Sequence, residues 1–275
     1  MSDIIQYKRA KYYDKIYSLF EMLKVMKGRE VVFMDRIENH KCIRGIWIKS
    51  IDYLKNHFDT FGFYKKDYNI YISSAKYIEI PSFTYNLKER SEQTSNFFER
   101  SFNSITEYDC LLDFDRGERS YIQMFTEVLL MKKILDCERV IHYIIPSGNN
   151  FQIVIPSEAF SFDRVFSNTD LDNSFNGKLK KIVENIKTNL KLKCLDLKNN
   201  GVHNRIMKCP YSLVRTRVCL PLFDIKDFKY TEMDSTEVLN KVFLKNRGIH
   251  YFNDFGEEKN RKNLNKFIYK YYLDV

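Results

Sequence analysis

The sequence lacks the signals that would place it in a membrane, in an oxidising compartment or around a structural zinc ion. No apolar run approaches the roughly 20 residues that span a bilayer, and the start has no apolar signal core. We therefore expect an intracellular protein, in the cytoplasm of a prokaryote or a virus-infected cell, or in a nucleus. The six cysteines include no Cys-x-x-Cys pair, so a zinc ribbon or finger is disfavoured and buried, reduced thiols are the simplest interpretation.

What the sequence does contain is enough apolar surface for a core and an excess of positive charge. Hydrophobic residues make up 44% of the 275 residues and aromatic residues 15%, which excludes a disordered chain and fits one or two domains. Lys and Arg number 45 against 36 Asp and Glu, giving a net charge of +9 and a pI near 9.0. This balance favours a polyanionic partner, nucleic acid first.

Apolar periodicity predicts the elements of an N-terminal portion. They are a helix over 12–26 that ends at Gly28, strands over 30–34, 42–47 and 68–74, and a short helix after Ser50. The polar stretch 84–107 is predicted to connect two lobes or to form a surface loop.

The second portion predicts an α+β domain on a mostly antiparallel sheet, because strands and helices follow each other in a fixed order. That order is a strand over 108–115, a helix over 119–135, strands over 140–145 and 151–155, a helix over 178–192 and a strand over 194–197. Along the helix over 119–135 the stepping residues are Ile122, Phe125, Val128 or Leu129, and Lys132. A turn at 146–150 makes the middle strands a hairpin. Beyond residue 224 the chain is predicted to be helical.

Asp113 and Asp115 stand at the end of the strand over 108–115. Side chains two apart on a strand share a face, so both carboxylates point the same way while Leu112 and Phe114 point into the core. Two neighbouring carboxylates repel unless a cation lies between them, and Mg²⁺ or Mn²⁺ with oxygen ligands meets that need. The competing interpretation is a strand end with solvated acids.

Three further features stand downstream of this acidic pair. Ser147-Gly-Asn-Asn150 is either an ordinary hairpin turn or a phosphate cradle of backbone N–H groups and a hydroxyl. Asp196 is a third carboxylate between two leucines, a place where a lone acid is usually a surface residue. Arg205 and Lys208, three residues apart, form either a phosphate-contacting pair or a solvated face.

Taken in order, these motifs resemble the archaeo-eukaryotic primase superfamily, whose members carry an acidic pair, a Ser-Gly-x-x-x-His turn and a third acid. The upstream segments Arg29–Phe33, Cys42–Arg44 and Tyr71–Tyr77, and the downstream Pro210–Leu213, are similar to the small catalytic subunit of DNA primase. The resemblance runs with gaps from about residue 8 to residue 228. It implies a two-lobed α+β primase fold, with an RRM-like antiparallel catalytic sheet packed on an N-terminal α/β lobe. The implied domains are an N-terminal lobe over 1–107, a catalytic lobe over 108–228 and a helical tail over 229–275.

The resemblance also implies the site. Its metal-binding and catalytic residues are Asp113, Asp115 and Asp196, with Mg²⁺ or Mn²⁺ as cofactor. Ser147, Gly148, Gln152, Arg205 and Lys208 are implied nucleotide contacts, and Arg29, Arg44 and His203 are candidate template or nucleotide contacts. Gln152 stands where the family has His, so a charge is missing there. The zinc-binding insertion of cellular relatives has no counterpart in the short stretch between Asp115 and Ser147.

The function implied is a DNA primase or primase–polymerase catalytic subunit that makes short primers on single-stranded DNA from nucleoside triphosphates. A large primase subunit or a helicase stays open as a further partner, and no membrane is involved. The alternatives are a gap-filling or end-joining repair polymerase of the same superfamily, a non-catalytic module that binds single-stranded nucleic acid, and a two-metal nuclease.

Overall fold

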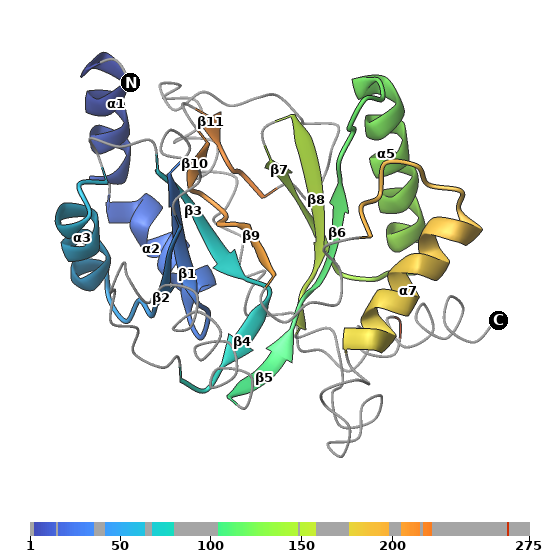
Figure 1. Cartoon of the computed structure of the whole chain (residues 1–275), viewed down its shortest axis with the longest axis horizontal. Helices are drawn as coiled ribbons and strands as arrows, with labels where there is room; N and C mark the ends of the chain where they lie inside the picture. Colours follow the sequence, from blue (N-terminus) through green and yellow to red (C-terminus); the bar gives the residue numbers. More distant parts are fainter. Residues whose placement is uncertain are drawn as a thin grey trace. The chain divides into compact units, whose positions relative to one another are not determined.

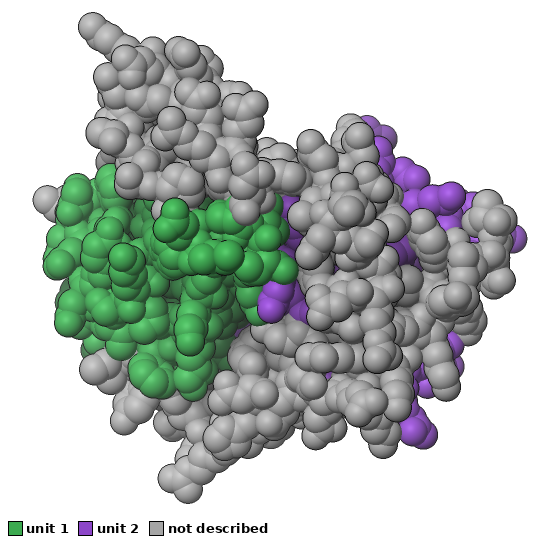
Figure 2. Space-filling model, turned by 90° about the horizontal axis from the view of Figure 1, so that it is seen from below, with its two compact units in different colours: residues 1–106, 206–220, 229–249 green, residues 107–205, 221–228, 250–275 purple. Residues whose placement is uncertain are grey.

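The chain divides into two compact units, which Figure 2 distinguishes by colour. The first comprises Met1–Thr106 with Ile206–Leu220 and a later segment, and the second comprises Glu107–Arg205 with the remainder. The computed structural model describes residues 3–14, 16–35, 42–63, 68–79, 104–147, 149–157, 176–197, 205–214, 217–221 and 263. In these described ranges no helix is both long and apolar enough to cross a membrane.

The first unit is built on a four-stranded antiparallel sheet with the strand order β2-β1-β3-β9. Its strands and helices are α1 (Asp3–Tyr13), α2 (Ile16–Met26), β1 (Val31–Asp35), β2 (Cys42–Ile46), α3 (Ile51–Thr60), β3 (Tyr68–Ser73), β4 (Ala75–Tyr77), β9 (Ile206–Lys208), β10 (Leu213–Val214) and β11 (Arg217–Val218). β10 pairs with β11, and β4 pairs with β5 (Ile105–Tyr108), in which the chain passes from one unit to the other.

Aromatic side chains form the core between the helices and this sheet. Phe33 of β1 lies 5.8 Å from Phe58 of α3, and Phe58 stacks on Phe63 at 4.3 Å, measured between ring centroids. Tyr13 packs edge-on against Phe63 at 5.3 Å. Such rings bury large apolar areas and prefer tilted or offset contacts. The Ser50 side chain accepts a hydrogen bond from the Tyr53 N–H, so α3 begins where the sequence predicts.

The second unit has the strand and helix order of an RRM-like sheet. Its elements are β6 (Cys110–Phe114), α5 (Tyr121–Cys137), β7 (Tyr143–Ser147), β8 (Asn150–Ile155) and α7 (Asn176–Asn189), followed by a short bridge of Leu195 to Phe114. The sheet order is β6-β8-β7, all antiparallel, with the bridged segment on the free side of β6. In chain order this gives 4-1-3-2, the arrangement of a β-α-β-β-α-β domain.

Helices α5 and α7 lie on the same face of this sheet (Figure 1). Leu112 and Phe114 are fully buried, as their alternation with Asp113 and Asp115 predicts. Phe151, the partner of Phe114 across the strands, lies 5.7 Å from the Phe125 ring of α5. The face with Leu112, Phe114 and Phe151 therefore packs on the helices, and Asp113 lies on the opposite face.

Several observed elements differ from the predicted ones. The predicted helix over 12–26 is two helices, since α1 ends at Tyr13 and α2 begins at Ile16. The Tyr13 hydroxyl accepts a hydrogen bond from the Leu213 N–H at this point. The buried face of α5 is Met124, Val128, Met131 and Leu135, whereas Ile122 is 76% exposed. The predicted strand over 194–197 is a single bridge.

Residues 206–208 hydrogen-bond to β3, although the predicted catalytic lobe over 108–228 includes them. The domain boundaries at 107/108 and 228/229 stay a prediction. Most of the predicted connection over 84–107 and the predicted helical tail over 229–275 lie outside the described residues, apart from β5 and residue 263.

Candidate active site at the end of the second sheet

Hydrogen bonds between main chains bring two of the three predicted acids side by side. The Asp196 N–H donates to the Asp113 carbonyl at 2.8 Å, and the Asp115 N–H donates to the Cys194 carbonyl at 2.8 Å. These two bonds flank the bridge of Phe114 to Leu195. Asp113 and Asp196, which are 83 residues apart in sequence, therefore sit on neighbouring segments of one sheet.

The Asp113 carboxylate is largely buried and has a hydrogen-bond donor on each oxygen. Gln152, its cross-strand partner on β8, donates from Nε2 to Oδ1 at 3.3 Å. Arg205 donates to Oδ2 and forms an ion pair with it. The side chains of Asp113 and Arg205 are 15% and 20% exposed, so their attraction is less screened than that of a surface pair.

The net effect on the Asp113 pKa is a rise above the usual value for aspartate. Burial is the main cause, because it disfavours the charged form. Arg205 and the hydrogen bond from Gln152 act in the opposite direction, and the charges of Asp196 and Asp115 raise the pKa further. The charges of Asp196 and Asp115 thus act on Asp113, and extra positive charge near its carboxylate is favourable.

Asp115 and the β7–β8 hairpin lie at the same end of the sheet. Asp115 is exposed, and its Oδ1 accepts a hydrogen bond from the Gly117 N–H at 2.9 Å in the turn that leads to α5. Ser147 ends β7 and pairs with Asn150 across the hairpin. The Asn150 Oδ1 accepts a hydrogen bond from the Arg116 N–H at 3.5 Å, which ties the hairpin to the turn after β6. Gly148, the predicted phosphate-approach residue, lies outside the described residues.

The three carboxylates fit a hard divalent cation by the chemistry of their oxygen donors and by the way their charges disfavour ionisation of Asp113. In the part of the chain that the structure describes, however, no three His, Cys, Asp or Glu side chains are gathered closely enough to hold a metal ion. Asp113 and Asp115 instead accept hydrogen bonds from Arg205, Gln152 and Gly117. Shared coordination of a cation would require these side chains to turn toward one another.

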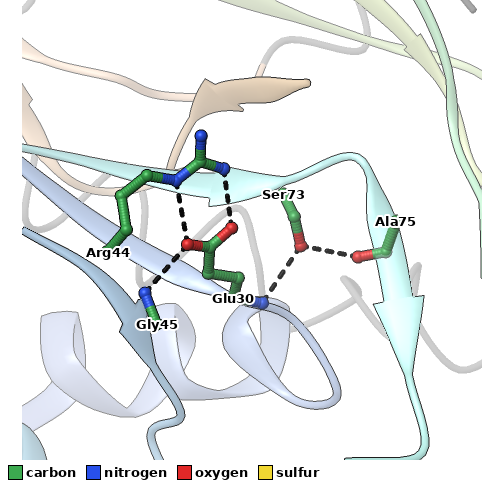
Figure 3. A network of polar contacts seen from close by, with 5 residues as sticks. All are labelled: Glu30, Arg44, Gly45, Ser73 and Ala75. Carbon is green, nitrogen blue, oxygen red and sulfur yellow. Dashed lines mark hydrogen bonds and ion pairs between the residues drawn. The ribbon is translucent and has the colours of Figure 1, made fainter. Parts of the chain in front are cut away.

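The first unit holds three of the other predicted site residues, each with a local partner. The Arg44 guanidinium donates to both oxygens of the fully buried Glu30, at 3.0 and 2.7 Å, and Glu30 also accepts from the Gly45 N–H (Figure 3). Arg29 is 5% exposed and donates to the carbonyl oxygens of Ser73 and Ser74. Both guanidinium groups therefore stabilise the fold of this unit, and their role as template or nucleotide contacts stays a prediction.

Lys208 is the third of these residues. It is 6% exposed on β9, and its ammonium lies 3.7 Å from the centroid of the Tyr71 ring and donates to the Tyr71 hydroxyl. This is a cation–π contact inside the first unit. His203, the remaining predicted contact, lies outside the described residues.

Sequence reasoning missed two contacts of the candidate site. It assigned Gln152 and Arg205 to phosphates and did not place either on Asp113. The Gln152 contact follows from pairing the strands 110–114 and 151–155 in register, so the sequence carried a signal for it. The Arg205 contact joins residues 92 apart, and no local pattern indicates it.

Comparison with known proteins supports the fold but not a family assignment. No protein-family model matches the sequence, and no curated protein matches it. Among solved structures, the chain is similar to the polymerase domain of ligase D from Mycobacterium tuberculosis in complex with DNA. The match has a TM-score of 0.55 and 12% sequence identity, and it covers 93% of this chain and 92% of that one. At this identity the likeness shows a shared fold, a mixed α+β architecture with antiparallel sheets that resembles this polymerase domain.

Proposed function

We propose that this protein is a template-directed nucleotidyltransferase, a DNA primase or primase–polymerase that makes short primers on single-stranded DNA. The observation that carries the proposal is the placement of Asp113 and Asp196 on adjacent segments of an RRM-like sheet, with Asp115 at the same end. The similarity of nearly the whole chain to a polymerase domain supports it. The net charge of +9 suits a nucleic-acid partner.

In this proposal the chain's own residues divide into acids that hold metal ions and groups that hold phosphates. Asp113, Asp115 and Asp196 would bind Mg²⁺ or Mn²⁺, which supplies charge stabilisation for attack of a 3′-hydroxyl on the α-phosphate and for loss of pyrophosphate. Ser147, at the end of β7, would donate its hydroxyl to the triphosphate. When a cation binds the Asp113 carboxylate, the Arg205 guanidinium would be released from its ion pair with Asp113 and would neutralise phosphate charge. Gly148 and Lys208 are proposed as further phosphate contacts.

Gln152 gives this site a different charge from that of the family's histidine. Its amide already donates to Asp113 and holds the carboxylate in place. We propose that Gln152 orients Asp113 and contributes a neutral donor, so that more of the triphosphate charge is left to Arg205.

A repair polymerase that fills gaps or joins ends is the second candidate. The observation that favours it is the similarity to the polymerase domain of a ligase, whose structure was solved in complex with DNA. Synthesis on an unprimed circular single strand defines a primase. Extension of a primed template without synthesis on the unprimed strand defines the repair enzyme. The two templates are therefore compared in one experiment, with labelled ribo- and deoxynucleotides and with Mg²⁺ or Mn²⁺.

The test of the catalytic proposal is the variant D113A/D115A in that assay. We expect incorporation to be abolished on both templates while binding of single-stranded DNA persists, because the acids are not needed for attraction to phosphates. Unchanged incorporation would refute the mechanism. The wild type could incorporate no nucleotide over a wide range of metal-ion concentrations but still bind single strands in the presence of a chelator. That result would make the protein a non-catalytic binding module. The hydrogen bonds that Asp113 accepts in the structure favour this hypothesis.

A further inference from the structure

The segment 193–196, which carries Asp196, is held in place by contacts on both of its sides. On the β6 side it makes two hydrogen bonds between main chains, from the Asp115 N–H to the Cys194 carbonyl and from the Asp196 N–H to the Asp113 carbonyl. Within the described residues, a single bridge, Phe114 to Leu195, pairs it with the sheet. So short a pairing leaves the segment dependent on other contacts for its position.

Helix α5 supplies those contacts through one side chain. The Glu127 carboxylate accepts the Lys193 N–H at 3.0 Å and the Cys194 N–H at 2.7 Å. It thus binds two consecutive N–H groups. A carboxylate acceptor makes these bonds charge-assisted, and such bonds are roughly twice as strong as neutral ones.

The surroundings of Glu127 indicate that this contact is local and specific. Glu127 is the only acid of α5 before Asp136, and it is half-buried on a helix whose neighbouring residue Val128 is fully buried. The Cys194 and Leu195 side chains are 1% and 0% exposed. The segment is therefore buried in the second unit next to the N–H groups that Glu127 binds. The Lys187 ammonium of α7 donates to the Leu195 carbonyl, which fixes the next peptide as well.

We propose that Glu127 is a positioning residue for Asp196, because it holds the segment 193–196 against β6 and so keeps the Asp196 carboxylate beside Asp113. The inference rests on the proposed function, in which Asp196 helps to bind the divalent ion. Glu127 itself does not touch substrate or metal. Partners that orient a metal ligand typically change affinity or activity 10- to 100-fold when they are removed, and displacement of a reacting group by ~1 Å has effects of similar size.

The first measurement is the affinity of the full chain for Mn²⁺ in the absence of nucleotide and template. Calorimetry or electron paramagnetic resonance measures this affinity. E127A is expected to weaken binding by about 10-fold or more. E127Q, which keeps one oxygen acceptor, is expected to lose less. E184A is the matched control, because Glu184 lies on α7, is 43% exposed and pairs only at 3.9 Å with Lys180.

The second measurement reads the exposure of the segment at Cys194. Burial raises the pKa of the Cys194 thiol, and the charge of Glu127 raises it further. Both E127A and E127Q remove that charge, so the difference in labelling between these two variants reports the position of the segment. Cys194 and Cys110 are 1% and 2% exposed in the same unit. If Glu127 holds the segment, E127A will increase alkylation of Cys194 in the native protein and leave Cys110 protected, as mass spectrometry of the labelled peptides shows. If both cysteines react equally in E127A, the unit has unfolded, and the same two readouts on E127Q then decide.

Different outcomes separate this inference from the proposed function. If D196N binds Mn²⁺ as tightly as the wild type, the proposed metal site is wrong. The positioning role of Glu127 is then refuted as well, because it depends on that site. If D196N weakens Mn²⁺ binding while E127A and E127Q change neither the affinity nor the labelling of Cys194, only the positioning role is overturned. A selective rise in Cys194 labelling together with weaker Mn²⁺ binding supports it.

Discussion

Asp113 is the residue at which opposing electrostatic effects meet. Burial raises its pKa, and Arg205 and Gln152 lower it. Removal of Arg205 should therefore raise the pKa further. In the proposed mechanism a protonated Asp113 cannot bind the cation, so we expect activity to fall as the pH falls through this pKa. R205M should shift the acidic limb of the pH–kcat/KM profile to higher pH, and R205K, which keeps the charge, should shift it less.

The comparison of R205M with R205K also separates two roles of the arginine. Loss of a triphosphate contact raises the KM for nucleotide at every pH, whereas loss of the Asp113 partner moves the limb. R116M, at an exposed arginine in the turn after β6, is the control. An acidic limb at the same pH in R205M and the wild type would show that Arg205 does not set the Asp113 pKa.

The pair of Arg44 and Glu30 is a second residue-scale case, in the first unit. Burial is the largest single effect and acts to lower the Arg44 pKa, but the charge of Glu30 and its hydrogen bonds with the guanidinium, with smaller contributions from Tyr77 and Cys42, together give a net upward shift. R44M would leave the fully buried Glu30 without its ionic partner. We expect a loss of about 3 kcal/mol in the free energy of unfolding, measured by urea denaturation. The double variant E30Q/R44M should recover most of that loss.

The matched control for R44M is K24M. Lys24 and Glu21 form a pair of similar length, 2.8 Å, but their side chains are 45% and 25% exposed. An exposed pair contributes about 0.5 kcal/mol or less. A loss for R44M no larger than that for K24M would mean that the buried network in Figure 3 does not stabilise the unit.

At the scale of elements, the start of α5 offers a test of how helices are set in the second unit. The Ser120 side chain accepts a hydrogen bond from the Gln123 N–H at 3.2 Å, and no other side chain caps this end in the described residues. S120A should cost about 1 kcal/mol. Hydrogen exchange should speed up in the first turn of α5, and S50A should have the same effect in α3 only. Equal exchange in S120A and the wild type would refute the cap.

The elements that the sequence predicted well are those fixed by local pattern. The strand with Leu112, Asp113 and Phe114 was predicted from alternation alone, and the hairpin before Phe151 from its turn residues. The face of α5 was predicted only in part. Val128 is buried, but Ile122 is exposed, because an apolar residue such as Ile122 fits either face until the sheet is known.

Contacts between distant residues set the parts that could not be predicted. β9 joins β3 across more than 130 residues, and no spacing in the sequence indicates that pairing. The candidate site shows the same limit. The residue types of its acids were visible in the sequence, but the contacts of Arg205 with Asp113 and of Glu127 with Cys194 depend on how helices and strands meet.

At the scale of the whole molecule, attraction to DNA and catalysis have opposite charge requirements. The chain has a net charge of +9, while its proposed catalytic residues are three acids that repel phosphate. D113N/D115N/D196N removes three negative charges and so raises the net charge from +9 to +12. Without divalent ions, this variant should bind single-stranded DNA at least as tightly as the wild type, because repulsion near the backbone is reduced.

Salt dependence tests whether the same contacts carry that binding. If about four phosphates are neutralised, affinity should fall roughly 50-fold between 50 and 200 mM salt, with the same slope for the wild type and the triple variant. Incorporation should be absent in the variant, and addition of Mn²⁺ should change DNA binding only in the wild type. Weaker binding by the triple variant in a chelator would mean that the acids build the DNA-binding surface itself, and the separation of attraction from catalysis would be wrong.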